Sequence, residues 1–395
     1  MQPINPNFVA TFPPPVMEAR RWVAGKDFGD ARPLLNLSQA APVDPPPASL
    51  AQAMAEALIE DASAHLYGPV LGRDDLRVEV AVQWSAAYGG TIAPDQVAIT
   101  AGCNQAFTAT MATLAGAGDE VILPLPFYFN HQMWLDMAQV RAVYLPTDDD
   151  LLPDPEAAAA LITNRTKAIV LVSPNNPAGV EYPAALLRAF ADLARKRGLA
   201  LIVDETYRDF HSGDGAPHDL FTDPDWSDTF IHLYSFSKAY RLTGHRVGAI
   251  VASEERLAEV EKFLDTVSIC PPQVGHIGAL WGMQNLGDWL AGERIEILAR
   301  RDAVTAGFQR LPEWRVLGCG AYFAYVRHPF GQASDAVAKA LVDCAHVLLL
   351  PGTMFGPLRN QGGSGQAEAT LRIAFANADA AGLSDLVDRL AQIDL

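Results

Sequence analysis

The most informative stretch of this chain, residues 233–248, reads Leu-Tyr-Ser-Phe-Ser-Lys-Ala-Tyr-Arg-Leu-Thr-Gly-His-Arg-Val-Gly. Its lysine, Lys238, directly follows an apolar run at 229–234 that is typical of a buried strand. The other five lysines of the chain lie in segments with the pattern of polar surface. An ammonium at the end of a buried strand is costly unless it is paired or neutral. One chemical role is a Schiff base with an aldehyde cofactor, and the alternative is a paired surface lysine in a loop. For a lone lysine the alternative is the commoner case, but Arg246, eight residues on, and the motifs upstream favour the chemical role.

On the N-terminal side of this stretch, apolar runs alternate with helical patterns from about residue 97 onward. Such alternation predicts a mostly parallel sheet that is covered by helices on both faces. Seven strands are predicted, at 97–100, 120–123, 141–145, 167–172, 199–203, 229–234 and 247–251. The helices predicted between them are at 104–114, 131–138, 155–162 and 183–197. The fold class is therefore α/β, with a large domain built on a seven-stranded sheet.

The two ends of the chain differ from this central pattern. Residues 1–15 are proline-rich and are predicted to form an extended arm. Helices follow at 16–24, 50–62 and 74–88, and after 285 the pattern changes to α+β. There we predict helices at 289–310 and 335–343, and strands at 315–317, 322–326, 347–349 and 371–374. We expect three parts: an arm with part of the small domain (1–45), a large domain (46–285) and a small C-terminal domain (286–395).

Composition excludes several classes of protein. A net charge of −17 over 395 residues argues against binding nucleic acid or an anionic membrane surface. No run of about 18 apolar residues predicts a membrane span, and the first residues lack the pattern of a signal peptide. The four cysteines show no metal-ligand spacing and are expected to be reduced thiols. We therefore expect a cytoplasmic protein without a metal site.

Three motifs at the ends of predicted strands carry polar or aromatic residues, and ligand sites of open α/β sheets form at such ends. In residues 100–106, Gly102, Cys103 and Asn104 begin a helix whose free amides suit a phosphate. Tyr128 belongs to an aromatic cluster that can stack on a heteroaromatic ring. Asn176, in the turn 173–179, can donate to an oxygen of a ligand. Each motif alone is also compatible with an ordinary turn or with core packing.

Two further positions carry charged side chains within or next to apolar strands, and each of these side chains needs a partner. Asp204 follows three buried apolar residues, so its carboxylate needs a partner such as a protonated ring nitrogen, and Tyr207 lies three residues on. Metal binding by Asp204 and the adjacent Glu205 is the competing interpretation. Arg372 lies inside an apolar strand and suits a substrate carboxylate, with a structural ion pair as the alternative. The residues that can hold a phosphate near Lys238 are Ser235, Ser237 and Arg246.

Taken together, these motifs resemble the class I/II aminotransferases of the fold type I pyridoxal-phosphate family, which includes aspartate aminotransferase. The resemblance spans about residues 36–376. It implies a pyridoxal 5'-phosphate enzyme that moves an amino group between an L-amino acid and a 2-oxo acid in ping-pong order. By this resemblance Lys238 forms the Schiff base and moves the proton, and Asp204 pairs with the pyridine nitrogen. Asn176 and Tyr207 contact the ring oxygen, and Tyr128 stacks on the ring.

The same resemblance assigns the remaining contacts. The phosphate is held by Gly102, Cys103, Asn104, Ser235, Ser237 and Arg246. The substrate carboxylate is held by Arg372, with contributions from Asn176 and the backbone of Ala40. Tyr67, in the run 65–72, matches the family tyrosine that reaches the phosphate of a partner subunit, which implies a homodimer with shared sites.

The sequence departs from the family pattern at two places. Ala40 stands where the family usually has glycine, and its methyl group could narrow the pocket. Residues 263–272 contain no arginine, although aspartate-specific members use one near there for a second carboxylate. Three functions remain in view: an aminotransferase, a β-elimination (C–S) lyase or decarboxylase with the same cofactor, and an aminotransferase-like sensor domain of a transcription regulator. The last is disfavoured because only about 30 residues, rich in proline, precede the catalytic part.

Overall fold

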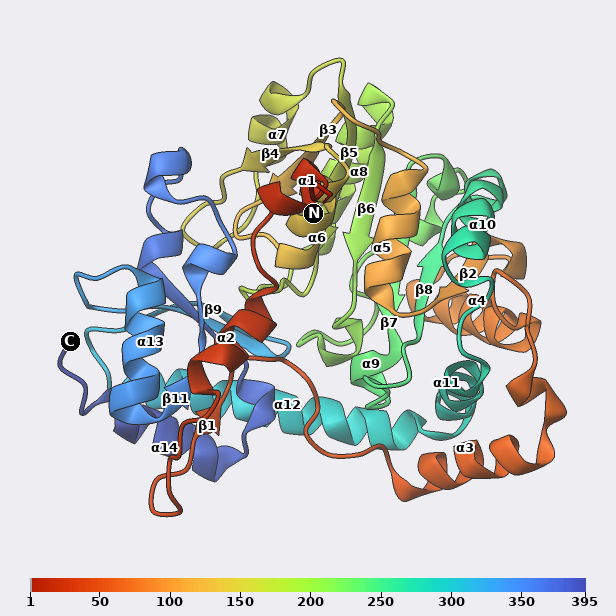
Figure 1. Ribbon diagram of the computed structural model, residues 1–395. Coiled ribbons are helices and arrows are strands. Elements are labelled where there is room, and N and C mark those ends of the chain that lie inside the picture. The colour runs from red at the N-terminus through yellow and green to blue at the C-terminus, as the bar shows by residue number, and fades with distance from the viewer. Residues whose placement is uncertain (1) are drawn as a thin grey trace.

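A seven-stranded sheet forms the centre of the computed structural model, which describes residues 2–395 (Figure 1). The strand order is β2-β8-β7-β6-β5-β3-β4. All neighbours pair in parallel except those of β8, which runs antiparallel to β7 and β2. The strands are β2 (Val97–Thr100), β3 (Glu120–Pro124), β4 (Arg141–Leu145), β5 (Thr166–Val172), β6 (Ala200–Asp204), β7 (Phe230–Ser235) and β8 (Gly248–Val251). The predicted fold class is confirmed.

Helices cover both faces of this sheet, because side chains alternate between the faces along each strand. On β6, Leu201 and Val203 join one buried core with α4, α8 and α11, whereas Ala200 and Ile202 join another with α5, α6 and α10. The helices of this part are α3 (Ala48–Glu60), α4 (Asp74–Tyr88), α5 (Cys103–Ala112), α6 (Phe129–Met137), α7 (Pro155–Leu161), α8 (Ala184–Arg197), α9 (Phe236–Ala239), α10 (Glu254–Ser268) and α11 (Gln273–Asn285).

A second, smaller sheet lies in the C-terminal part of the chain, with the order β12-β13-β10-β9 and all pairs antiparallel. It has its own buried core with the long helix α12 and with α13 and α14. Its elements are α12 (Gly287–Phe308), β9 (Arg315–Gly320), β10 (Phe323–Arg327), α13 (Ser334–Ala345), β12 (Leu350–Pro351), β13 (Thr370–Ile373) and α14 (Ala380–Leu390). β1 (Leu35–Asn36) pairs in parallel with β11 (Val347–Leu348), which attaches the N-terminal segment here. The domain boundaries near 45 and 285 stay a prediction.

The N-terminal segment differs from the sequence prediction. It is not extended throughout, because α1 (Pro6–Ala10) forms a short helix before α2 (Pro15–Val23). A proline at the first helical position costs no hydrogen bond, and Asn5 accepts from the Asn7 amide as a cap. In Figure 1 the segment, drawn in red, passes from the C-terminal part to α6, and the Thr11 hydroxyl donates to Asp136 at 2.9 Å. Within residues 2–395, no helix is both long and apolar enough to cross a membrane.

Candidate active site

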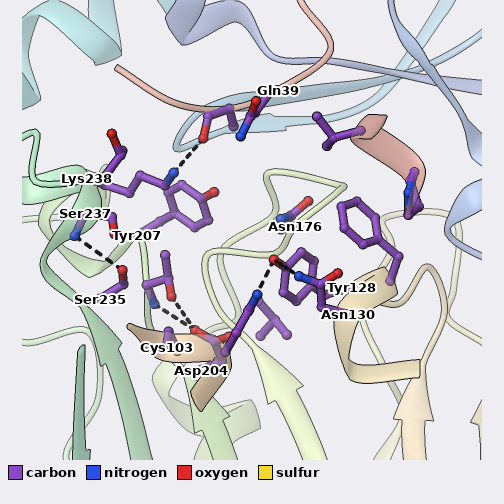
Figure 2. Close-up of a pocket in the computed structure, with 18 of the residues that line it drawn as sticks. Gln39, Cys103, Tyr128, Asn130, Asn176, Asp204, Tyr207, Ser235, Ser237 and Lys238 are labelled. Carbon is purple, nitrogen blue, oxygen red and sulfur yellow. Dashed lines mark hydrogen bonds between the residues drawn. The ribbon is translucent and has the colours of Figure 1, made fainter. Parts of the chain in front are cut away.

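A cavity of about 480 Å³ opens at the carboxyl ends of β5, β6 and β7. The C-terminal part contributes Arg372 to its wall, and the N-terminal segment contributes residues from before and within α2. Figure 2 shows side chains from these distant parts of the chain directed toward one space. The predicted site residues that line it are Ala40, Cys103, Asn104, Tyr128, Asn176, Asp204, Tyr207, Ser235, Ser237, Lys238, Arg246 and Arg372. Gly102 lies just behind the wall, and Tyr67 lies outside the cavity.

Lys238 sits in α9, the short helix that begins where β7 ends. Its Nζ donates a hydrogen bond of 2.6 Å to the Ala40 carbonyl (Figure 2). Burial, together with the nearby charges of Arg246 and Arg372, lowers the pKa of the Lys238 amine to about 7. No carboxylate pairs with this amine in the described part of the chain. Near neutral pH a large share of Lys238 is therefore an uncharged nucleophile.

Asp204 ends β6 and is 4 % exposed. Its Oδ1 accepts from the Thr206 amide at 3.0 Å and from the Thr206 hydroxyl at 2.7 Å. Its Oδ2 lies 3.4 Å from His131 Nε2. Burial would raise the pKa of Asp204, but the contacts with His131 and Thr206 outweigh it and leave the pKa below its ordinary value. Asp204 is thus an ionised acceptor at the floor of the cavity, and the expectation that it needs a partner is met in part by His131.

The start of α5 packs tightly against Arg246. Gly102 has φ +88°, and a Cβ at this position would lie 2.2 Å from Arg246 Nη2. The Arg246 guanidinium also donates from Nη1 to the Thr243 carbonyl at 3.0 Å and to Ser237 Oγ at 3.5 Å. Backbone amides at a helix start, hydroxyl groups and an arginine are the donors that bind phosphate. The Cys103 thiol lies against Asp204 and Thr206, and burial raises its pKa, so its amide rather than its sulfur belongs to this set.

Arg372 is on β13 and is 2 % exposed. Its Nη1 donates to Asn176 Oδ1 at 2.8 Å, and its Nη2 donates to the Ser38 carbonyl at 2.5 Å. Its buried Nε has no partner, and burial lowers the pKa of the guanidinium to about 10. Among residues 2–395 Arg372 forms no ion pair. This finding does not support the alternative interpretation of Arg372 as part of a structural ion pair. A buried guanidinium without a carboxylate is well suited to bind an anionic ligand.

The three tyrosines assigned from the sequence differ in their surroundings. The Tyr128 hydroxyl accepts from Asn130 Nδ2 at 3.1 Å and lies 3.4 Å from Asn104 Oδ1 (Figure 2). Tyr207 is buried, and its ring packs edge-on against Phe323 at 5.1 Å between centroids. Tyr67 is 79 % exposed.

Sequence reasoning missed two parts of the site. His131 is not among the predicted site residues, and its place near a strand end, three residues after Tyr128, is the one available signal. The side of the cavity formed by the N-terminal segment had no signal at all, because its residues are ordinary for a proline-rich arm. We call this side the roof, and it consists of Pro14, Pro15, Val16, Met17, Arg20 and Gln39.

The fold and the cavity define a class: a two-part α/β enzyme with a lysine, an acid and an arginine around one cavity. Residues 32–390 match the family described as aminotransferase class I and II. An arginine–pyruvate transaminase of Pseudomonas aeruginosa is 31% identical over 82% of this chain and 83% of its own. An aromatic aminotransferase of Arabidopsis thaliana is 30% identical over 76% and 77%. In fold, aspartate aminotransferase of Thermus thermophilus superposes with a TM-score of 0.89 over 99% of this chain and 100% of its own, at 24% identity.

The chain therefore belongs to the class I and II aminotransferase family. It is an aminotransferase of the kind that depends on pyridoxal phosphate. The resemblance read from the sequence is thereby confirmed.

Proposed function

We propose that this aminotransferase binds pyridoxal 5'-phosphate in the cavity, joined to Lys238, and that Arg372 binds the carboxylate of an L-amino acid or a 2-oxo acid. The observation that carries the proposal is the pairing of a lysine of lowered pKa with a buried, uncompensated arginine on one cavity. These are the two groups that an amino-transfer reaction requires from the protein: a nucleophilic amine and a carboxylate clamp.

The donor set fits the cofactor. Arg246, the hydroxyls of Ser235 and Ser237, and the amides of Gly102, Cys103 and Asn104 would hold the phosphate group. The space beside Gly102 is so confined that a Cβ would strike Arg246, as expected where a backbone must approach a phosphate closely. The ionised Asp204 would pair with a protonated ring nitrogen. Asn176 and Tyr207 would contact the ring oxygen, and Tyr128 would stack on the ring.

Pyridoxal phosphate, when bound, supplies an aldehyde for the amino group and a conjugated ring that accepts an electron pair from the substrate. The protein supplies the rest. Arg372 orients the substrate through its carboxylate, and Ala40 lies beside Lys238 at the edge of this space. With the cofactor bound, Lys238 Nζ would accept the proton of the substrate α-carbon and deliver it to the cofactor carbon that carried the aldehyde oxygen, because an amine with a pKa of about 7 can hold or release a proton near neutral pH. Water would then release the 2-oxo acid and leave the amino group on the cofactor, and a second 2-oxo acid would take up that amino group by the reverse steps.

A single-turnover assay tests this proposal. Holoenzyme is mixed with a panel of L-amino acids without any acceptor, and the released 2-oxo acid is measured. We expect one equivalent of 2-oxo acid per site with at least one amino acid, and none with Lys238→Ala. Turnover by Lys238→Ala at the normal rate would contradict the role of Lys238. Release of ammonia and pyruvate from a cysteine conjugate without an acceptor would instead identify the β-elimination lyase.

We further propose that the chain forms a homodimer in which Tyr67 reaches the phosphate in the partner subunit. The support is the 79 % exposure of Tyr67 together with exposed Ile59 and Leu66 close by in sequence. Sedimentation of the holoenzyme is expected to give twice the chain mass. Tyr67→Phe is expected to weaken cofactor affinity without changing that mass, and a monomeric, fully active holoenzyme would refute the shared site. The cytoplasmic location expected from the sequence stays a prediction.

A further inference from the structure

Two carboxylates follow one another at the end of β6, and they point to opposite faces of the sheet. Asp204 lies on the face of α5 and α6 and lines the cavity. Glu205 lies on the other face, against Tyr88 of α4, and is 1 % exposed. The alternation of side chains along a strand produces this division. Nothing in the proposed function uses Glu205.

Three donors converge on one oxygen of Glu205. Its Oε2 lies 2.5 Å from the Tyr88 hydroxyl, 2.8 Å from His232 Nε2 and 3.2 Å from His218 Nε2. Each of these three partners is itself buried. Among residues 2–395 no set of three His, Cys, Asp or Glu side chains could hold a metal ion, so the cluster is a hydrogen-bond network.

The surrounding contacts fix how the protons are distributed in this network. His218 Nδ1 accepts from the Leu220 amide at 3.2 Å, so its proton must be on Nε2, which donates to Glu205. The Nδ1 atom of His232 is buried without a partner, and burial lowers the pKa of that ring, so it too donates from Nε2 in its neutral form. Burial would raise the pKa of Glu205, but the contacts with His218 and His232 bring it well below its usual value. Glu205 is therefore an ionised acceptor inside an apolar core.

A cation of the same short segment lies beside this network, and the Arg208 side chain pairs with Asp209 at 3.9 Å. The Arg208 guanidinium lies 4.0 Å from the centroid of the Trp84 ring and 4.8 Å from that of Tyr88. The Arg208 amide donates to the Glu205 carbonyl at 3.0 Å. Asp209 completes the group, because its Oδ2 accepts from the Tyr234 hydroxyl at 2.6 Å. The segment 204–209 is therefore anchored by a buried polar cluster, and this cluster lies on the face of the sheet opposite to Asp204.

Such a cluster is not explained by stability alone. Apolar side chains of similar volume are often as stable as a buried ionic group, because desolvation offsets much of the attraction. The cluster instead fixes the orientation of the Glu205 side chain, because three donors of fixed geometry leave one orientation for its carboxylate. The turn that carries Glu205 also carries Asp204 and Tyr207, which both line the cavity.

We propose that Glu205 is a positioning residue of the active site. Held by Tyr88, His218 and His232, it fixes the turn 204–207 so that Asp204 and Tyr207 keep their direction toward the cofactor ring. The inference rests on the proposed function, in which those two residues contact the ring while a separate set of residues holds the phosphate.

The apoenzyme provides a test that does not depend on turnover. Glu205→Gln keeps the shape of the side chain but removes its charge and one acceptor. We expect its affinity for pyridoxal phosphate to fall at least tenfold, as for the loss of residues that orient other ligand-binding groups. Its affinity for inorganic phosphate, a probe of the site formed by Gly102, Ser237 and Arg246, is expected to stay within twofold of the original.

Glu120→Gln is the matched control. Glu120 is also 1 % exposed and ionised, and it accepts from Thr163 at 2.6 Å and from Arg165 at 2.7 Å. It lies at the start of β3, the end of the sheet remote from the cavity. Glu120→Gln is expected to lower the unfolding temperature without changing cofactor affinity. An equal loss of cofactor affinity in both variants would overturn the proposal, and so would a loss of phosphate affinity in Glu205→Gln equal to its loss of cofactor affinity.

Two further results separate this inference from the proposed function. In the Glu205→Gln holoenzyme, the pH midpoint of the cofactor's visible absorbance is expected to move in the same direction as in Asp204→Asn, by a smaller amount. If Asp204→Asn shifts the midpoint and weakens binding but Glu205→Gln does neither, only the positioning role is refuted. If neither variant changes anything, the assignment of Asp204 itself fails, and with it the positioning role.

Discussion

Replacing Lys238 by methionine is expected to stabilise the apoenzyme at neutral pH, and the gain is expected to vanish as pH rises. The folded pKa of Lys238 is about 7 and its ordinary value is 10.5, so the unfolded chain binds one proton more between these values. Stability contributed by such a group rises with pH across that window, with a slope that approaches about 1.4 kcal/mol per pH unit. Below pH 7 the destabilisation of the folded protein by the buried Lys238 amine is fully present, and above pH 10.5 it is absent. The methionine side chain does not titrate, so this substitution removes the contribution of position 238 to the slope of unfolding free energy against pH.

The measurement is denaturant-induced unfolding of the cofactor-free protein at pH 7.5, 8.5 and 9.5, for the original chain and for Lys238→Met. Other titrating groups are common to both proteins and cancel in the difference. The loss of the hydrogen bond to the Ala40 carbonyl adds an offset that does not change with pH. The difference in unfolding free energy is expected to favour the variant most at pH 7.5 and to shrink steadily toward pH 9.5. Parallel pH curves would refute a lowered pKa for Lys238.

Three more substitutions test the site. Arg372→Gln removes a charged donor and is expected to lower kcat/KM about 10- to 100-fold in steady-state assays, since such bonds are worth about 1.5–3 kcal/mol; unchanged kinetics would remove Arg372 from substrate binding. Gly102→Ala combines a φ of +88° with a clash at Arg246. Equilibrium dialysis should show about tenfold or greater weakening of the cofactor, given a cost of at least 1.4 kcal/mol. His131→Phe removes a donor that lowers the pKa of Asp204. Because a lowered carboxyl pKa protects the ionised form down to more acid pH, the variant should lose cofactor at a higher pH during acid titration.

Much of the large sheet could be predicted because its strands are buried on both faces and therefore appear as short apolar runs. The strands at 97–100 and 141–145 match the prediction to the residue. Helices α10 and α11 were missed. In α11, three glycines lower the helix propensity, yet each allows a close approach: a Cβ on Gly275 would lie 2.6 Å from the His245 carbonyl, and one on Gly278 2.7 Å from Met54 Sδ. Tertiary packing here outweighs local propensity.

The residues of the site were predictable to the extent that they follow strands. Lys238, Asp204 and Asn176 each follow a strand of one sheet, and the carboxyl ends of parallel strands share an edge. The polar cluster around Glu205 was not predictable, because it joins residues more than a hundred positions apart, such as Tyr88 and Glu205. The same holds for the roof, whose residues reach the cavity only because the N-terminal segment crosses it.

The departure at Ala40 also has a structural account. The loop of residues 38–40 contacts both the Arg372 guanidinium and the Lys238 amine through backbone carbonyls, since Ser38 accepts from Arg372 and Ala40 accepts from Lys238. A third carbonyl, that of Gln39, accepts from Asn377 of the C-terminal part. Carbonyl contacts do not depend on the side chain, and Ala40 does not have a positive φ, so nothing in this backbone requires glycine.

The methyl group of Ala40 therefore takes up space in the cavity but does not strain the backbone. It lies 8 % exposed where the cavity meets the core of the C-terminal part. In the proposed function Arg372 binds the carboxylate that all amino acids share, so discrimination between substrate side chains would come from other lining residues. The roof offers both apolar and charged side chains for this purpose: Met17 is apolar, and the Arg20 guanidinium donates to Gln39 Oε1 at 2.8 Å. We therefore expect substitutions in the N-terminal segment to change the substrate preference more than substitutions at the strand ends do.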